Sequence, residues 1–275
     1  CKKVWTPKKY QKEITHPQAI ETVQLFIPFQ GASAVQKLYV LVSLDATRGN
    51  ILHLSTNYTQ HQTGDSLRYS YKGNTEPTMH HRDIVQKVDM REAQFLRRSQ
   101  FDEIQYGSAV LKRNGKGAIL RPVITAHGHF RILKIRYPDV KTHIISHECF
   151  LRGAIITAWA DQFRQQQGEL WFVEEEISDS NADTPWHFKG TTYHGWWQNQ
   201  WQRWEQGNNC KMVCLLTGAS LERGANVSLA TSRCFITWLT DQHDFTQSAL
   251  LSAGRVTQML TSLALKYNES LTPSC

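Results

Sequence analysis

The chain has 275 residues, of which 40% are hydrophobic and 20% are charged, and its formal net charge is +7. This composition excludes an intrinsically disordered chain, and no apolar stretch approaches the roughly 18 residues of a transmembrane helix. The basic excess permits contact with nucleic acid without establishing it. With six cysteines, no CxxC pair and no visible secretory segment, we expect reduced thiols and a cytoplasmic protein.

The first residues of the chain are strongly basic. The opening twelve residues, CKKVWTPKKYQK, contain five lysines and no acid. We expect residues 1–36 to form a basic arm that continues into a loop punctuated by prolines and a glycine. The lysines of this arm are candidates for contact with nucleic-acid phosphates, namely Lys2, Lys3, Lys8, Lys9 and Lys12.

Two apolar runs follow the arm. KLYVLVSLD, residues 37–45, is rich in β-branched residues and predicts a central strand that is buried on both faces. ILHLST, residues 51–56, predicts a second strand that the turn TRGN joins to the first in a hairpin. Residues 67–72 alternate in polarity and predict a third strand, whereas the apolar spacing in 81–99 predicts a helix.

The segment RPVITAHGHFRILKIRYPDVKTHIISHECF, residues 121–150, predicts a strand at 121–126, a helix at 128–136 and a strand at 141–146. A long helix then begins with Ser146 as its N-cap and continues to Gly168. This helix carries an apolar stripe at i, i+3, i+4, i+7 and i+8, formed by Leu151, Ala154, Ile155, Ala158 and Trp159.

Residues 169–275 are rich in tryptophan, and we expect them to form a mainly helical region that packs on the preceding domain. Trp197, Trp201 and Trp204 stand at helical spacing and predict one face of a helix. Core packing is the plain interpretation of these rings, and stacking on unpaired bases is the functional alternative. Residues 211–218 predict a short buried strand or helix, and 244–268 predict an amphipathic helix.

The predicted order in residues 37–168 is three strands and a helix, followed by strands that alternate with helices. This order and the phrases LYVLVSLDATRGNILHLS and PVITAHGHFRILKIRYPD resemble the ribonuclease-H-like domain of DDE-type insertion-sequence transposases. The opening CKKVWTPKK resembles the end of the zinc ribbon that often begins such proteins. The resemblance implies an α/β fold with a mixed sheet flanked by helices over residues 37–168.

The resemblance also implies a catalytic site. Proteins of this family hold Mg²⁺ or Mn²⁺ with carboxylates and transfer phosphoryl groups on DNA. Asp45 falls at the first carboxylate position, and Glu148 and Asp161 are the acids available for the third. The second position coincides with Ala126, which cannot bind a metal. His127 beside it is a candidate substitute ligand that would favour Mn²⁺ or Zn²⁺.

The departure at Ala126 leaves two versions of this function open. The chain is either an active DNA strand transferase or nuclease, or an inactivated derivative that still binds DNA. The implied partner is DNA. We expect no association with a membrane, and the formation of a homo-oligomer stays open. Plain roles for the candidate acids also stay open: Asp45 as a turn cap, Glu148 as an acid in a first helical turn, and Asp161 as a solvated helix residue.

Two functions of other classes stay open as well. Four histidines lie within 21 residues of one another and could together hold zinc and activate water, namely His127, His129, His143 and His147. The protein would then be a zinc-dependent hydrolase. Alternatively, the tryptophan-rich half could bind a partner, and the protein would be a non-enzymatic interaction module.

Overall fold

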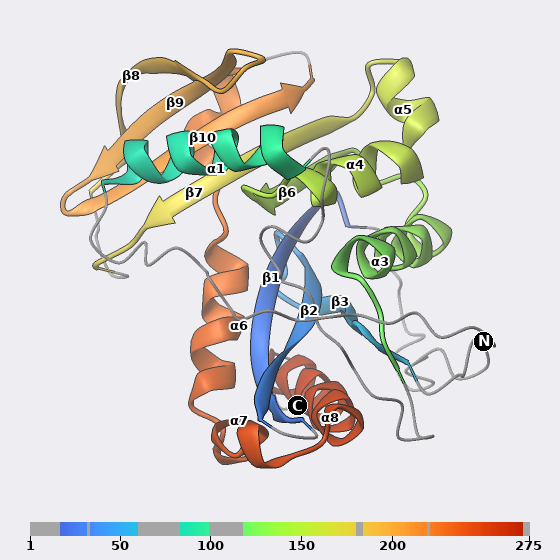
Figure 1. Ribbon diagram of the computed structural model, residues 1–275. Helices are drawn as coiled ribbons and strands as arrows, with labels where there is room; N and C mark the ends of the chain where they lie inside the picture. Colours follow the sequence, from blue (N-terminus) through green and yellow to red (C-terminus); the bar gives the residue numbers. More distant parts are fainter. Residues whose placement is uncertain are drawn as a thin grey trace.

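The computed structural model describes residues 17–31, 34–59, 83–98, 118–179, 184–218 and 221–271. These residues form an α/β fold in which a mixed sheet of eight strands is flanked by helices (Figure 1). The strand order across the sheet is β3-β2-β1-β6-β7-β10-β9-β8. The α/β class and the mixed sheet predicted from the sequence are therefore confirmed. A separate short ladder pairs β4 (Tyr58–Thr59) with β5 (Ala118–Ile119).

Five strands form one half of the large sheet. The first three, β1 (Ala19–Gln30), β2 (Val35–Asp45) and β3 (Ile51–Thr56), form an antiparallel meander. The chain then returns to the other side of β1, where β6 (Thr142–Ser146) runs parallel to it and β7 (Glu169–Glu176) runs parallel to β6. The predicted β2–β3 hairpin and the strand predicted at 141–146 are confirmed.

Strand β1 lies inside the segment 1–36, which we predicted to be an arm and loop, so that prediction is wrong for residues 19–30. The prolines in this segment suggested a loop, because proline cannot donate to a sheet ladder. Pro28 is tolerated because its nitrogen faces away from β2. The amide of Gln30, two residues later, has the same orientation and donates to the carbonyl of Leu251 at 2.7 Å. Strand β6 pairs with β1 only as far as Thr22, so Pro28 interrupts no ladder there.

The other edge of the sheet is a second antiparallel unit formed by β8 (His187–His194), β9 (Asn199–Gln206) and β10 (Asn209–Thr217). It joins the first half through the antiparallel pairing of β10 with β7. The helix that we predicted from the tryptophan spacing is wrong, because these residues lie in β9 and in the turn before it. One sheet thus continues across the predicted boundary between residues 168 and 169.

Four helices cover one face of the sheet: α1 (Ile84–Arg98), α3 (Pro122–Arg136), α4 (Cys149–Ala158) and α5 (Ala160–Arg164) (Figure 1). Helix α1, predicted at 81–99, is confirmed, and the predicted long helix after β6 is divided at Trp159 into α4 and α5. Its predicted N-cap is also shifted, since Glu148 rather than Ser146 caps α4.

The strand predicted at 121–126 is wrong, because these residues begin helix α3. Pro122 stands in the first turn of the helix, where its missing N–H leaves no hydrogen bond unmade. Ala126 and Phe130, four residues apart, are both fully buried against the sheet. Ala126 is therefore a core residue of a helix and does not lie at the end of a strand.

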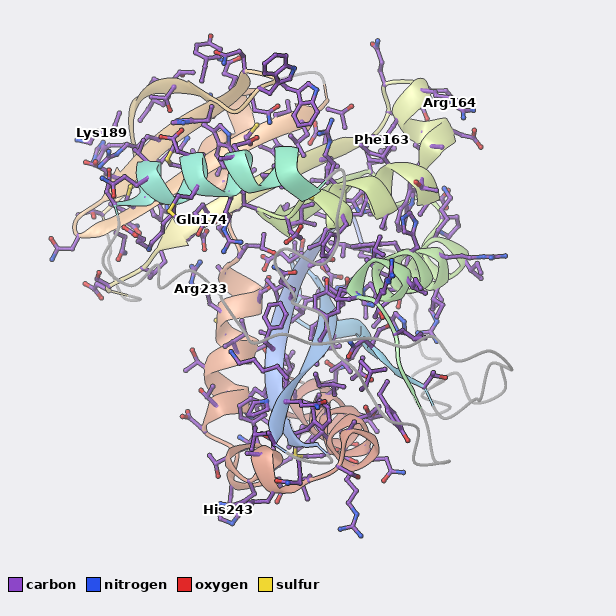
Figure 2. All side chains as sticks on the ribbon, viewed as in Figure 1. Phe163, Arg164, Glu174, Lys189, Arg233 and His243 are labelled. Atoms are coloured by element: carbon purple, nitrogen blue, oxygen red, sulfur yellow. The ribbon has the colours of Figure 1, made fainter. Side chains whose placement is uncertain are left out.

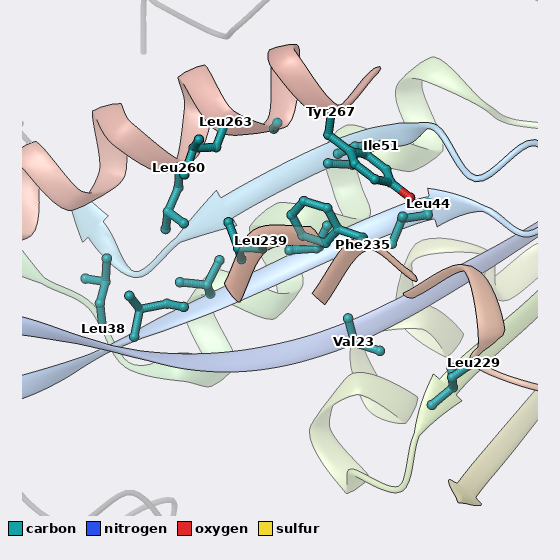
Figure 3. Packing of buried hydrophobic residues seen from close by; sticks show 14 of the residues in the cluster. Val23, Leu38, Leu44, Ile51, Leu229, Phe235, Leu239, Leu260, Leu263 and Tyr267 are labelled. Carbon is teal, nitrogen blue, oxygen red and sulfur yellow. The ribbon is translucent and has the colours of Figure 1, made fainter. Parts of the chain in front are cut away.

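The opposite face is covered by α6 (Ala230–Thr240) and α8 (Ala253–Leu271), with the short elements η1 (Leu221–Asn226), α7 (His243–Thr246) and η2 (Ser248–Leu250) around them. Figure 3 shows side chains of both helices packed on strands β1, β2 and β3. They include Phe235, Leu239, Leu260, Leu263 and Tyr267.

The sheet supplies apolar side chains to both faces, as the near-continuous apolar run of β2 predicts. Tyr39 and Leu41 belong to the core beneath α3 and α4, whereas Leu38 and Val40 belong to the core beneath α6 and α8. In the part of the chain that the structure describes, no helix combines the length and apolar character that a membrane crossing requires. The cysteines within the described ranges, Cys149, Cys210, Cys214 and Cys234, are free thiols.

Candidate functional site

Two carboxylates meet at the first turn of helix α6. Glu21 projects from β1 and is 3% exposed, and its Oε2 accepts hydrogen bonds from the backbone N–H and the hydroxyl of Ser232, both at 2.9 Å. Glu175 projects from β7, and its Oε1 accepts the backbone N–H of Leu229 at 3.0 Å. The free N–H groups of a helix start favour such negative partners. We call Glu21, Glu175 and Arg233 the acid–arginine site.

Arg233 supplies the positive charge of this site. Its guanidinium forms an ion pair with Glu175, whose side chain is only 6% exposed. Figure 2 shows Arg233 at the start of α6, below the strand that carries Glu174. Burial lowers the pKa of Arg233, and attraction to Glu21 partly offsets this effect. Burial likewise raises the pKa of Glu21, and hydrogen bonds from Thr231 and Ser232 oppose the rise. The two acids therefore share one fixed cation from the chain itself.

The strand between the two acids contributes a hydroxyl to this region. Ser146 ends β6 and pairs with Val173 of β7, two residues before Glu175. Its Oγ is buried, and among the described residues it has no hydrogen-bond partner. The three parallel strands therefore carry a glutamate, a serine and a glutamate in this region, and not three acids.

These residues do not fit the divalent metal ions that the resemblance implies. Within the described ranges, no group of three or more His, Cys, Asp or Glu side chains is placed to hold a metal ion. Glu21 and Glu175 are already engaged by helix N–H groups, and the guanidinium of Arg233 would repel a cation. The arrangement can attach α6 to the sheet, and the partly exposed guanidinium can donate hydrogen bonds to a phosphate.

The structure does not bring the predicted catalytic acids together. Asp45 ends β2, is 3% exposed, and accepts the backbone N–H groups of Thr47 and Arg48 in a tight turn. It pairs with Ile20, which in turn lies beside the first half of β6. Glu148 follows the opposite end of β6, is fully buried, and caps helix α4. Asp161 lies on α5 with its side chain 88% exposed, beside Arg164.

The four histidines of the zinc hypothesis also lie apart. His127 is exposed on α3, and His129 is buried on the same helix. His143 lies within β6, and its ring packs 4.3 Å from that of Trp159. Burial lowers the pKa of His143 to about 3, and within the described residues neither ring nitrogen has a hydrogen-bond partner. The zinc cluster that we considered is therefore not formed among the described residues.

His129 belongs to a buried hydrogen-bonded chain that links β1, β2, β3 and α3. Its Nε2 lies 2.8 Å from the hydroxyl of Ser43, which lies 2.6 Å from that of Thr22. Its Nδ1 lies 2.9 Å from the hydroxyl of Ser55, which also contacts His53. Burial lowers the pKa of His129 well below its ordinary value, so a neutral ring takes part. This chain gives both ring nitrogens of His129 a hydrogen-bond partner and fixes how α3 sits on the sheet.

A second polar cluster holds helix α1 on the sheet. Glu92 is 1% exposed, and its Oε1 lies 3.2 Å from Nε2 of His147 and 3.0 Å from Nδ2 of Asn199. Burial raises the pKa of Glu92, but the hydrogen bond and charge interaction with His147 and the bond from Asn199 outweigh it, so the pKa is lowered. One helical turn earlier, Asp89 lies 2.5 Å from Nδ1 of His194.

The same helix makes two more ion pairs at the end of β7. Lys87 pairs with Glu176, and Nε of Arg91 lies 3.4 Å from Glu174. Ile84 and Val88 are fully buried beneath the helix. Because these contacts join α1 to three different strands, the helix is a fixed part of the fold.

The tryptophans divide between the core and the surface. Trp201 is fully buried beneath α1, and its ring stacks with that of Phe172 at 6.3 Å. Trp197 is 55% exposed and Trp196 is 75% exposed, both in the turn between β8 and β9. The single apolar face predicted for these residues is therefore wrong, since a strand sends neighbouring residues to opposite sides.

Sequence reasoning missed the acid–arginine site. Glu21 lay in the predicted loop, and Glu175 belongs to the run EEE at 174–176, where nothing marks one acid as buried. The five candidate DNA-binding lysines lie outside the described residues. No protein-family model, no curated protein and no solved structure matches this chain.

Proposed function

We propose that the protein is a DNA-binding protein with a ribonuclease-H-like fold, related to DDE-type transposases, that has lost metal-dependent phosphoryl transfer. The observation that carries the proposal is the strand order β3-β2-β1-β6-β7, with two antiparallel pairings followed by two parallel ones. Helices α3 and α4 stand between the successive parallel strands. The resemblance implies this arrangement. The first strand is β1, however, and not the strand predicted at residues 37–45, which lies in β2.

The loss of catalysis follows from the acid–arginine site. Phosphoryl transfer by divalent ions needs carboxylates that are free to bind them. Glu21 and Glu175 are instead bound by the first turn of α6 and by Arg233. A guanidinium stays charged over the ordinary pH range, so a change of pH does not release Glu175 from Arg233.

DNA binding is supported by charge. The chain has a net charge of +7, and the arm that precedes β1 is its most basic segment. Contacts from lysines to phosphates release counterions, so the binding constant is expected to fall linearly with salt on a double-logarithmic plot.

The experiment is a titration of labelled duplex DNA with the full chain over a series of salt concentrations, followed by fluorescence anisotropy. The proposal predicts binding at low salt that weakens steeply as salt rises. An absence of binding at the lowest salt concentration would refute the DNA-binding half of the proposal. The catalytic half is tested separately with Mg²⁺ and Mn²⁺, under which the bound DNA should stay intact.

A further inference from the structure

We propose that the protein forms a symmetric dimer in which strand β8 pairs with β8 of a second copy. The two strands run antiparallel, so the sheet of one copy continues into the sheet of the other. This inference goes beyond the proposed function, because it assigns a partner to one edge of the sheet and does not depend on DNA binding. It rests on the exposure of β8, on the register of its side chains and on the charges around it.

Strand β8 is an open edge of the sheet. It is the last strand in the sheet order and lies on the outside of the fold (Figure 1), and within the described residues no further strand pairs with it. Of its eight residues, only His194 is buried. An open edge offers unpaired N–H and C=O groups to another strand, and proteins often block it with proline or several charges. Strand β8 contains no proline, and Lys189 is its one permanently charged residue.

The opposite edge of the sheet, β3, is closed by the chain itself. The backbone N–H of Ile51 donates to Oδ1 of Asn268 at 2.7 Å, and Nδ2 of Asn268 donates to the carbonyl of Ile51 at 3.0 Å. The side-chain amide of this α8 residue therefore bonds the edge as a neighbouring strand would. Directly after β3, the carbonyl of Asn57 accepts the N–H of Leu120. One edge is thus occupied at these positions, whereas β8 is left open.

The side chains of β8 are spaced for pairing with a second copy. The pairing of β8 with β9 is irregular between Phe188 and Gly190, so Lys189 is an extra residue in the ladder. As a result, the β9 partners of Phe188, Thr191 and Tyr193 are two residues apart, at positions 204, 202 and 200. Because alternate residues of a strand share a face, these three side chains lie on one face, with Thr191 midway between the two rings.

A twofold axis at Thr191 makes this strand complementary to itself. It places Thr191 opposite the partner's Thr191 and Phe188 opposite the partner's Tyr193, and the symmetry repeats the aromatic pair. Pairs of aromatic residues and of threonines across antiparallel strands are favourable contacts. Phe188 is 51% exposed and Tyr193 is 59% exposed, so a single copy leaves both rings largely in water. The dimer gives each ring an aromatic neighbour.

The charges around β8 are compatible with an antiparallel partner. Lys189 lies at the outer edge of β8 (Figure 2), is 48% exposed, and has its acid partner on β9 at 3.4 Å. At the other end of the strand, Asp89 of α1 is 59% exposed and pairs with His194. The second acid of α1 at this end, Glu92, is buried in contacts of its own. Antiparallel pairing sets Lys189 opposite the partner's Thr192 and brings it toward the partner's Asp89.

The test is sedimentation velocity of the full chain without DNA, from low to high micromolar concentration. Two paired strands make a smaller interface than those of obligate dimers, so we expect a dimer that dissociates on dilution. Sedimentation of the native chain as a monomer at every concentration would overturn the inference.

Charge at the axis tests the register. Thr191 is exposed, and Thr191→Lys sets two lysines opposite one another only in the dimer. The dissociation constant should rise about tenfold or more, and Thr191→Glu should act in the same way. Mixing the two variants should restore the dimer, because a lysine then faces a glutamate. A loss of fold could not produce this recovery.

Ile135→Lys is the matched control, since it adds the same charge to a residue of α3 that is 73% exposed. It should dimerise like the native chain. Circular dichroism checks the fold of each variant. If both variants at Thr191 unfold, Phe188→Ser takes their place and should also weaken the dimer, because it removes a ring from each aromatic pair.

Two further results would overturn the inference. The first is a dimer of folded Thr191→Lys that is as stable as that of the native chain, which would place the interface elsewhere. The second is a failure of the mixed lysine and glutamate variants to recover the dimer, which would remove Thr191 from the axis. Either result leaves the proposed DNA binding untouched, because no DNA is present in the test.

Discussion

Arg233 and the first turn of α6 together supply the positive charge that Glu21 and Glu175 require. The two acids come from strands β1 and β7, which are separated in the sheet by β6. The first turn of α6, with Ser232 on Glu21 and Arg233 on Glu175, therefore joins one helix to two strands and also explains why the acids do not form a metal site.

Replacing Arg233 by methionine tests this role. The change keeps most of the side-chain length but leaves the buried Glu175 carboxylate without its cation. The free energy of unfolding should fall by about 1–3 kcal/mol in urea denaturation at neutral pH. Arg164→Met removes an ion pair on α5 whose members are 78% and 88% exposed, and it should have no measurable effect. Equal losses in the two variants would contradict the role assigned to Arg233.

His143 predicts a pH dependence. Its pKa in the folded chain is about 3 because the ring is buried, whereas the unfolded chain has an ordinary value near 6.5. Between these values the unfolded state binds a proton that the folded state does not, so stability falls as the pH falls. His143→Leu should reduce this slope by about 1.4 kcal/mol per pH unit.

The measurement is urea denaturation at several pH values between 4 and 7. The exposed His127→Leu on α3 is the control and should leave the slope of the native chain unchanged. A slope that is the same in the native chain and in His143→Leu would show that His143 is protonated in the fold or titrates similarly in both states.

At the scale of elements, α1 is held by two contacts between an acid and a histidine that differ greatly in burial. Glu92 and His147 are buried, whereas Asp89, one turn earlier, is 59% exposed in its pair with His194. Because the interior favours neutral or paired groups, the buried contact should contribute more to the position of α1.

Glu92→Ala should therefore loosen α1 and lower the free energy of unfolding by about 1–3 kcal/mol, since His147 and Asn199 lose a buried acceptor. Hydrogen exchange should accelerate in α1 before it does in β6. Asp89→Ala on the same helix should cost less than about 1 kcal/mol. A larger loss in Asp89→Ala than in Glu92→Ala would reverse this ranking.

The lowered pKa of Glu92 also predicts a pH dependence. The stability that Glu92 contributes is present above the ordinary pKa of a carboxyl group and is lost as the pH falls through its lower pKa in the folded chain.

The sequence predicted those elements whose local pattern agrees with their surroundings. The hairpin of β2 and β3 was predictable because β2 is apolar on both faces and a glycine-containing turn follows it. Strand β9 was not predictable, because its tryptophans fall at helical spacing. Trp201 is buried because β9 pairs with β10, and the local sequence does not show this pairing. The helix predicted at 128–136 is confirmed as the second part of α3. Its first turns were predicted as a strand because they are rich in β-branched residues, and packing of Phe130 and Leu133 outweighs the preference of those residues for strands.

The candidate site was less predictable than the fold. Asp45 and Glu148 are buried acids, as functional acids often are, but each satisfies backbone N–H groups at a turn or a helix start. Glu21 and Arg233 are 212 residues apart in the chain, and only the completed sheet brings their elements together. No local pattern contains that contact.

At the scale of the whole molecule, the proposed DNA binding depends on the basic residues of the chain, whose net charge is +7. The basic arm makes a quantitative prediction. Replacing its five lysines by glutamine should reduce the slope of log binding constant against log salt by up to about 4.5, since each phosphate contact contributes about 0.9. These residues are Lys2, Lys3, Lys8, Lys9 and Lys12. An unchanged slope would remove the arm from the DNA interface.

The most direct measurement incubates the full chain with duplex DNA in Mn²⁺ at low salt, and then determines both the bound fraction and the integrity of the recovered DNA. The proposed function predicts that the DNA is bound and is recovered uncut, with the same bound fraction when Mn²⁺ is omitted. DNA that is not bound, or that is nicked only when Mn²⁺ is present, would contradict it.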